Sequence, residues 1–494
     1  MAKIGFTAIQ LSPVHPPSMQ THGEKLGSAY APRDHGAVGR HLWDPKLSHD
    51  AYLQTGKQPF LALARSSELL ETPGPQALAD GLNSRGGAFA NLPEYYQQGW
   101  RSLRELTTFA GQHGLKVVGD IVLAHTARDG DTLALHQGMF GNDVYLRTGS
   151  EIQTPGSHDH LGRYDPWHDV APIDLTGPAA MAVGNYYLMS LGLFLEAGVN
   201  VFRADSAVRI LPFWETGFIE SSRLFADRLG LQRPAFYAET QGTWNAEQDI
   251  RVLIGHGFDG VTNAFAWWDL AARWHIDQLR ATWEAGGLSV SFASSHDTAP
   301  FAGMSPAARE QVARLVMTAT LSGVFTMLAG TLSGSTQKPS VFLPEYQPQA
   351  PGGPSPDEGQ GSLRGMMISL LALKGAHPIL GMTTYTQMTQ DGKVVFFHKA
   401  TESEEAVIAY NPQPETANFA VEPDYRNGLA FYAFVDSDGK IRYGDGPSGP
   451  VNSYSLAPGG IAVFAKRLQP GRTSIIPPRS APPIDAPRGL RLQP

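Results

Sequence analysis

The sequence predicts an α/β protein: a TIM (β/α)8-type barrel followed by a small antiparallel β domain. Two observations predict the barrel. Apolar runs typical of buried strands alternate with helical stretches along most of the chain, and charged side chains follow those runs at their C-terminal ends. A third observation predicts the second domain, because the apolar residues adopt a period of two from about Met382 onward.

Seven apolar runs have the length and composition of buried parallel strands. In chain order they are residues 6–11, 115–125, 199–202, 235–238, 258–262, 288–293 and 324–329. Helices are expected between them, such as an amphipathic one over residues 94–113 that Gly114 ends, and another that begins after Gly177-Pro178. A closed barrel needs an eighth strand, and the gap lies before Phe6. We therefore expect the first strand to be missing from the N-terminus, or Thr473–Ile476 in the tail to take its place.

The remaining segments set the expected domain boundaries. The barrel is placed at residues 1–378, with a long loop insert at about 13–93 and a short one at about 126–177. The antiparallel β domain is placed at 382–467. A Pro/Arg-rich tail follows at 468–494 and is expected to be disordered. An apolar-periodic piece within the long insert, residues 58–70, is expected to be helical.

Composition excludes several classes of protein. The 494 residues are too many for one ordinary core. The 38 basic and 46 acidic side chains give a formal charge of -8, which argues against nucleic acid or an anionic membrane as a partner. The absence of cysteine excludes disulfides, thiolate metal sites and thiol catalysis. No apolar run is long enough for a membrane span and the N-terminus lacks a signal-peptide pattern, so the expected location is the cytoplasm by default.

Charged and polar side chains gather at the ends of the predicted strands, where barrel enzymes assemble their active sites. They are Asp120 and His125 after the second run, Arg203 and Asp205 after the third, Glu239 after the fourth, and His296 and Asp297 after the sixth. Residues two apart on a strand share a face, so Arg203 and Asp205 are expected to lie side by side. That pair is either a nucleophile kept ionised by a guanidinium or a structural ion pair.

Four segments carry a family resemblance. DIVLAH, VFRADSAV, YAET and SSHD resemble, in order, the four signature regions of the α-amylase family, glycoside hydrolase family 13, and the similarity covers roughly residues 1–465. The resemblance implies a retaining mechanism with Asp205 as nucleophile, Glu239 as general acid/base and Asp297 as a third carboxylate that binds sugar hydroxyls. It also implies supporting or sugar-binding roles for Arg203, His125, His296, Tyr30 and Asp120, with Tyr30 as a stacking platform and Asp120 paired with Arg203.

Some of these residues have simpler interpretations. His125 could be a strand-end histidine with satisfied hydrogen bonds, and Tyr30 lies in a long loop where the match is loose. Most of a group of five tryptophans are expected in the core, with one or two lining acceptor subsites. They are Trp244, Trp267, Trp268, Trp274 and Trp283.

Departures from the family pattern narrow the function. Ala124 stands where calcium-dependent amylases have a metal-binding Asn, so no metal site and no cofactor are expected. Val208-Arg209 replaces the usual Lys-His after the nucleophile. HTARDGD and FRADSAVRILPFWE resemble bacterial maltosyltransferases of the family more than secreted amylases.

Three functions therefore remain open from the sequence. The first is an enzyme that hydrolyses or transfers units of α-1,4-glucans or maltooligosaccharides. The second is a maltosyltransferase-like transglycosylase with little hydrolysis. The third is a non-catalytic carbohydrate-binding homologue, against which the complete set of three carboxylates stands.

Overall fold

The structure is a computed structural model. It describes residues 1–19, 21–22, 25–26, 28–44, 46–47, 62–158, 164–240, 246–264, 273–297, 308–328, 331–333, 363–420, 429–438, 440–445 and 453–467. Within these ranges, no helix combines the length and apolar character that a membrane crossing requires.

A seven-stranded parallel sheet forms the centre of the molecule, in the order β1-β4-β11-β12-β13-β14-β15. The strands are β1 (Ala8–Gln10), β4 (Lys116–Ile121), β11 (Val201–Ala204), β12 (Ala235–Ala238), β13 (Gly260–Ala264), β14 (Leu288–Phe292) and β15 (Val324–Thr326). Each coincides with one of the seven predicted runs, and neighbours in sequence are neighbours in the sheet. The predicted (β/α) architecture is thus confirmed.

The two edges of the sheet, β1 and β15, face the position of the eighth strand. Neither edge pairs with a further strand in the described part of the chain. Phe6, just before β1, and Phe325 of β15 stack with ring centroids 6.4 Å apart. This contact joins the segment that leads into β1 to the opposite edge strand, β15. The alternative candidate for this place, Thr473–Ile476, lies outside the described residues.

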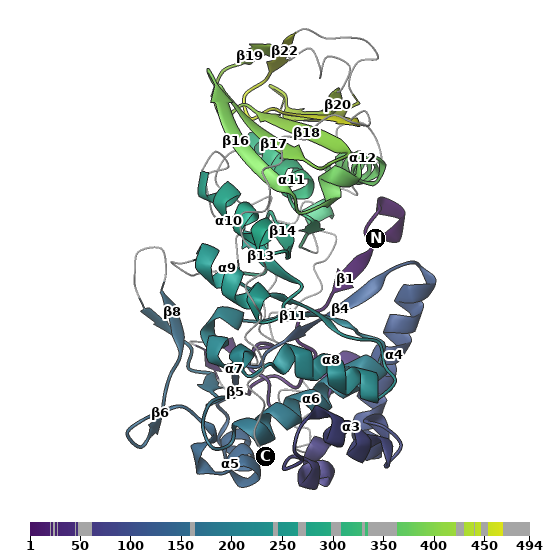
Figure 1. The fold of residues 1–494 in the computed structure, drawn as a ribbon, viewed down its shortest axis with the longest axis vertical. Coiled ribbons are helices and arrows are strands. Elements are labelled where there is room, and N and C mark those ends of the chain that lie inside the picture. The colour runs from purple at the N-terminus through teal and green to yellow at the C-terminus, as the bar shows by residue number, and fades with distance from the viewer. Residues whose placement is uncertain are drawn as a thin grey trace.

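Helices between the strands cover the outside of the sheet (Figure 1). The larger ones are α4 (Glu94–Gln112), α6 (Ala180–Glu196), α8 (Phe218–Arg228), α9 (Ala246–Gly255), α10 (Arg273–Glu284), α11 (Ala308–Leu321) and α12 (Leu363–Ala376). In α6, every residue from Tyr186 to Leu195 is buried, because this helix contacts α4 and α8 and places the Phe194 ring against Phe202 of β11.

Both inserts carry short elements. The first contains β2 (Thr21–His22), β3 (Lys25–Leu26), α1 (Arg40–Trp43), the 3-10 helices η2 (Ala62–Leu69) and η3 (Phe89–Asn91), and α3 (Pro75–Asn83). The second contains β5 (His125–Ala127), α5 (Gly130–Phe140), the 3-10 helix η4 (Asn142–Val144), β6 (Arg147–Thr148), β7 (Glu151–Ile152), β8 (Gly156–His158), β9 (Tyr164–Pro166) and β10 (Val170–Pro172). Strands of two or three residues are too short to show a period, so the sequence pattern missed them.

Short elements also connect the strands and helices of the central domain. These are the 3-10 helices η1 (Ala2–Ile4), η5 (Ala207–Ile210), η7 (Thr331–Ser333) and η9 (Pro378–Gly381), and the helix α7 (Leu211–Glu215). Of these, η5 and α7 follow strand β11 directly and therefore shape the edge of the site described below.

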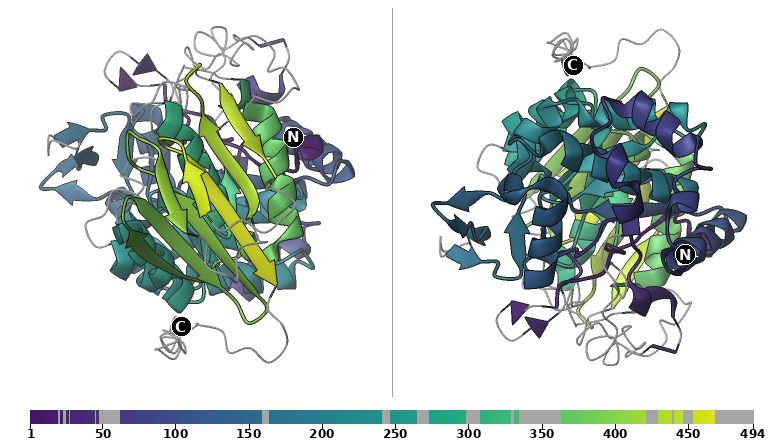
Figure 2. Two further views of the ribbon diagram at one scale, coloured as in Figure 1. Left: turned by 90° about the horizontal axis from the view of Figure 1, so that it is seen from above. Right: turned by 90° about the horizontal axis from the view of Figure 1, so that it is seen from below.

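An antiparallel six-stranded sheet, in the order β16-β17-β18-β23-β20-β21, lies at one end of the molecule (Figures 1 and 2). Its strands are β16 (Tyr385–Asp391), β17 (Val394–Ala400), β18 (Glu404–Tyr410), β20 (Leu429–Val435), β21 (Ile441–Gly444) and β23 (Ile461–Arg467), while β19 (Ala417–Ala420) and β22 (Ser453–Leu456) form a separate pair. The four period-two runs of the sequence correspond to β17, β18, β20 and β23.

Every residue of strand β18 is buried, so both faces of this strand are covered. Ile408 on one face packs with residues of α11 and α12, whereas Val407 on the other face packs with Phe419 of β19. The sheet therefore has a core on each side. One of these cores is shared with the barrel helices and attaches the β domain to them.

Candidate active site

The ends of β4, β11 and β12 bring three carboxylates to one place. Arg203 on β11 pairs in register with Asp120 on β4. The Asp205 N–H donates to the Ile121 carbonyl at 2.9 Å, and the Glu239 N–H donates to the Ala204 carbonyl at 3.1 Å. Backbone hydrogen bonds thus continue past the strand ends and set the positions of Asp205 and Glu239.

The guanidinium of Arg203 binds all three carboxylates. Its Nη1 lies 2.8 Å from both oxygens of Asp120 and 3.1 Å from Asp205 Oδ1, and its Nη2 lies 2.6 Å from Glu239 Oε1. All four side chains are at least nine-tenths buried. The predicted Asp120–Arg203 and Arg203–Asp205 pairs are therefore present, and Glu239 is a further partner of the same cation.

One buried cation among three buried acids favours retention of a proton. Burial raises the pKa of Glu239, and the charge of Asp205 raises it further against the opposing effect of Arg203. Burial likewise raises the pKa of Asp205, with Arg203 lowering it and Asp297 raising it. Burial also raises the pKa of Asp120 to about 7 despite Arg203. These coupled acids titrate as a group, which suits a site that needs one ionised and one protonated carboxyl.

A second set of side chains adjoins the carboxylates. The Tyr30 ring stacks on the His296 ring with centroids 4.8 Å apart and planes at 9°, and the Tyr30 hydroxyl donates to Asp120 Oδ2 at 3.0 Å. His296 Nε2 lies 3.2 Å from Asp297 Oδ2, whose side chain is 49% exposed. His125 Nε2 lies 2.8 Å from the Tyr30 carbonyl oxygen. Burial lowers the pKa of His125 to about 4, so this imidazole is neutral at pH 7.

All eight residues singled out in the sequence thus lie in one connected cluster, although they come from segments up to 267 positions apart, Tyr30 to Asp297. The arrangement offers two carboxyl groups that share a cation, an exposed carboxylate beside a histidine, and an aromatic face. Their individual catalytic roles stay predictions.

Two neighbours of the cluster were missed by sequence reasoning. Trp167, beside β9, has its ring centroid 6.2 Å from that of His125, and the Arg209 guanidinium lies 4.4 Å from the Trp167 ring centre. The sequence signal was an aromatic residue within an Asp-, Pro- and His-rich segment. Ser206, directly after the nucleophile candidate, donates its N–H to Glu239 Oε2 at 2.8 Å, and a backbone donor of this kind has no sequence signal.

Of the five tryptophans noted in the sequence, the side chain of Trp283 is the one that lies within the described part of the chain. Trp283 of α10 packs edge-on against Tyr385 of β16, with ring centroids 5.6 Å apart, and so lies between the barrel and the β domain. Trp244, Trp267 and Trp268 lie outside the described residues. Trp274 belongs to α10, but its side chain lies outside the described part.

Ala124 stands where the family resemblance placed a calcium-binding Asn. Ala124 is buried, and its carbonyl oxygen accepts the Ile173 N–H at 3.1 Å. Nearby, the buried Arg33 binds Asp129 at 2.8 Å and Asp131 at 2.9 Å, joining the first insert to the second. No group of three metal-ligating side chains is found in the described ranges. Independence from calcium stays a prediction.

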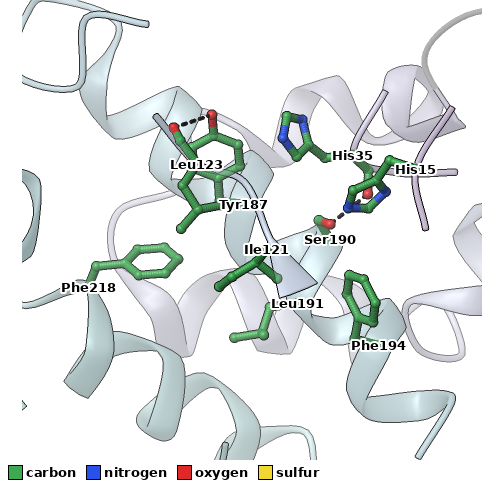
Figure 3. Close-up of a pocket in the computed structure, with 9 residues that line it drawn as sticks. All are labelled: His15, His35, Ile121, Leu123, Tyr187, Ser190, Leu191, Phe194 and Phe218. Carbon is green, nitrogen blue, oxygen red and sulfur yellow. Dashed lines mark hydrogen bonds between the residues drawn. The ribbon is translucent and has the colours of Figure 1, made fainter. Parts of the chain in front are cut away.

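A narrow cavity lies behind the end of β4, between that strand and helices α6 and α8 (Figure 3). It is lined mainly by apolar side chains, with His15 and His35 at one end. His15 Nδ1 hydrogen-bonds to the Ala37 carbonyl at 2.9 Å, and burial lowers its pKa to about 4. None of the eight clustered residues lines this cavity, so it belongs to the core and not to the site.

Comparison with solved structures identifies the fold. An α-amylase from Lactobacillus plantarum matches with a TM-score of 0.57 and 14% identity, over 94% of this chain and 92% of that one. The α-amylase GTA from Geobacillus thermoleovorans, solved with acarbose, matches with a TM-score of 0.56 and 15% identity, over 95% and 89%. A cyclomaltodextrinase matches with a TM-score of 0.57 and 14% identity, over 94% and 69%. The chain therefore has the fold of α-amylase-family enzymes.

Sequence comparison gives a partial match. No family model matches the chain. An α-1,4-glucan:maltose-1-phosphate maltosyltransferase from Burkholderia pseudomallei (strain K96243) is 24% identical over 198 residues, which are 40% of this chain. The match spans only 16% of that relative's length. The resemblance to the α-amylase family thus extends from the four motifs to the fold.

Proposed function

We propose that the protein is a retaining enzyme that acts on α-1,4-glucans or maltooligosaccharides, by hydrolysis or by glycosyl transfer. The observation that carries this proposal is the sharing of one buried guanidinium by Asp205 and Glu239. Retaining glycosidases need a nucleophilic carboxylate and a carboxylic acid a few ångströms apart, and a common cation holds two such groups together.

In the first step, an Asp205 oxygen attacks the anomeric carbon of the bound sugar while the bond to the leaving oxygen breaks. Glu239 gives its proton to that oxygen, and a β-glycosyl ester forms on Asp205. In the second step, Glu239 takes a proton from water or from a sugar hydroxyl, whose oxygen displaces Asp205 and restores the α configuration. Two inversions account for net retention.

The other clustered residues support these steps. Arg203 stabilises the ionised form of Asp205, and Asp120 completes the pairing of that guanidinium. One face of the Tyr30 ring lies against His296, and the opposite face is assigned to stacking on a pyranose ring. Asp297, with its partner His296, is exposed enough to bind sugar hydroxyls, and neutral His125 can donate or accept a hydrogen bond.

The experiment is incubation with maltooligosaccharides of defined length, with reducing ends counted and chain lengths followed over time. A rise in reducing ends indicates hydrolysis, and redistribution of lengths at constant reducing ends indicates transfer. If neither changes while the sugars still bind, the protein is a carbohydrate-binding homologue and the proposed enzymatic function is wrong.

A second candidate function is maltosyl transfer from maltose 1-phosphate. It is favoured by the partial match to a maltosyltransferase and by Arg209, whose guanidinium interacts electrostatically with Asp205 and Glu239. A guanidinium close to these two carboxyl groups can bind a phosphate leaving group, which is an anion. In this reaction the bond from C1 to the phosphate oxygen breaks as the Asp205 ester forms, and a glucan hydroxyl then accepts the maltosyl unit.

Release of inorganic phosphate from maltose 1-phosphate, with glucan as acceptor, tests this candidate. Arg209→Gln is expected to reduce the phosphate-releasing reaction at least tenfold more than it reduces any activity on neutral maltooligosaccharides. Equal reductions on both substrates would show that Arg209 does not recognise phosphate. Arg223→Gln on α8, whose partner is Asp259, is the matched control.

A further inference from the structure

Ser206 has a backbone conformation that L-amino acids rarely adopt. Its φ of 49° and ψ of 34° lie in the left-handed region, and it is the one non-glycine residue with positive φ in the described part of the chain. A side chain with a Cβ costs roughly 1–2 kcal/mol in this region. The residue lies between the nucleophile candidate Asp205 and the 3-10 helix η5. Such local strain requires a compensating interaction.

That interaction is made by the backbone. The left-handed conformation points the Ser206 N–H at Glu239 Oε2, 2.8 Å away, and the Ser206 carbonyl accepts the Arg209 N–H at 2.9 Å. Since Arg203 binds the other oxygen of Glu239, both oxygens of this carboxyl group are held. One of the two anchors belongs to the residue next to Asp205 in the chain.

We propose that Ser206 is a positioning residue, whose strained left-handed backbone fixes the carboxyl group of Glu239 relative to Asp205. This inference rests on the proposed roles of Asp205 and Glu239. The donor to Glu239 is the N–H of the peptide bond that joins Asp205 to Ser206. Because this donor belongs to the backbone, no change of side-chain rotamer can move it. The spacing between the two carboxyl groups is therefore tied to the covalent backbone. A misplacement of about 1 Å at a reacting group can cost about 10²-fold in rate.

The test compares four substitutions at this position, all of which retain the backbone N–H. Gly and Asn adopt the left-handed region readily, Ala does so at a cost similar to that of Ser, and Val is excluded by its branched Cβ. We expect kcat of Ser206→Gly, Ser206→Asn and Ser206→Ala to stay within about fivefold of the wild type. We expect Ser206→Val to lose about 10²-fold in kcat with a much smaller change in KM, because orientation is lost and sugar binding is not.

The pH profile separates the backbone from the hydroxyl. Burial raises the pKa of Glu239, and the Ser206 N–H opposes that rise by stabilising the charged form. Loss of this donor in Ser206→Val should therefore move the alkaline limb of kcat/KM to higher pH. Burial and Asp297 raise the pKa of Asp205, while Arg203 and the Ser206 hydroxyl lower it. Ser206→Gly, Ser206→Ala and Ser206→Asn lack the hydroxyl but keep the left-handed backbone, so they should move only the acidic limb, also to higher pH.

Two outcomes would overturn the proposal. One is a Ser206→Val variant with the kcat and the alkaline limb of the wild type. The other is equal loss of kcat in Ser206→Gly and Ser206→Val, which would assign the effect to the hydroxyl. If Ser206→Val does not fold, amide hydrogen exchange decides: the Ser206 N–H should exchange at least tenfold faster in Glu239→Ala than in the wild type, and unchanged exchange refutes the bond. This measurement remains decisive even if the protein has no activity on glucans.

Discussion

Arg203 Nη2 lies 2.6 Å from Glu239 Oε1, so the general acid candidate is bound to the same guanidinium as the nucleophile candidate, Asp205. Two carboxyl groups with opposite protonation requirements thus share one cation. Their other partners differ. Glu239 also accepts a hydrogen bond from the Ser206 N–H, whereas the negative charge of the exposed Asp297 raises the pKa of Asp205. Four expected outcomes follow from this arrangement and its surroundings.

Replacement of Glu239 tests the acid/base role. Glu239→Gln should lower kcat on maltooligosaccharides by about 10² to 10⁴-fold, because an amide cannot donate a proton to the leaving oxygen. Initial rates at saturating substrate measure the effect. Glu247→Gln on the exposed side of α9 is the matched control and should retain the wild-type rate. Full activity of Glu239→Gln would show that another group supplies the proton.

Replacement of Arg203 tests the shared cation. Arg203→Gln leaves Asp120, Asp205 and Glu239 buried without their counter-charge, so the free energy of unfolding should fall by about 3–5 kcal/mol near neutral pH. Denaturant titration measures the change. The loss should shrink at acidic pH, where the carboxyl groups become neutral. Arg228→Gln, which breaks an exposed pair with Asp80, is the control and should leave the denaturation midpoint unchanged.

Replacement of Tyr30 tests the aromatic face. Tyr30→Phe keeps the stack on His296 and loses only the hydroxyl bond to Asp120, so kcat/KM should fall by less than tenfold. Tyr30→Ala removes the face as well and should lower kcat/KM by a further 10- to 100-fold, mainly through KM. Steady-state kinetics on one maltooligosaccharide distinguish the two variants. Equal effects of both substitutions would mean that the ring does not contact the sugar.

Buried histidines predict loss of stability in acid. Burial lowers the pKa of His15, His125 and His136 to about 4, below the ordinary value of 6.5. Between these values the unfolded chain binds more protons than the folded one, so stability is full above pH 6.5 and falls as pH decreases towards 4. Each histidine contributes on the order of 3 kcal/mol to this loss.

Unfolding measured by denaturant at several pH values checks this expectation. His136→Phe keeps an aromatic ring beside Tyr145 and should reduce the pH slope by one proton. A pH slope that stays unchanged in His136→Phe would contradict the neutral, buried state of His136. The net slope of the wild type also contains the opposite contribution of Asp120, Asp205 and Glu239, whose pKa burial raises.

Much of the fold was predictable because its causes are local in sequence. All seven strands of the central sheet were located, since each is a short apolar run that ends in polar residues. Seven of the eight candidate site residues were found for a related reason: the C-terminal ends of parallel strands meet at one edge of the sheet, and four motifs stand at those ends. Tyr30, in the first insert, was proposed only through the family resemblance. The elements that escaped prediction, such as β6 and β8, are hairpin strands too short for any pattern.

The relationships between those residues were decided by the tertiary structure. The sequence by itself determined that Arg203 and Asp205 share a face and that Asp120 and Glu239 stand at the ends of the preceding and the following strand. It did not determine that one guanidinium would bind all three acids, that Ser206 would adopt a positive φ and donate to Glu239, or that Arg209 would stack on Trp167. These contacts join segments that are distant in the chain, and their geometry depends on strand register and on how the second insert folds over the sheet. Periodicity specifies which face a side chain occupies, whereas the partner on that face is set by the packing of the whole domain.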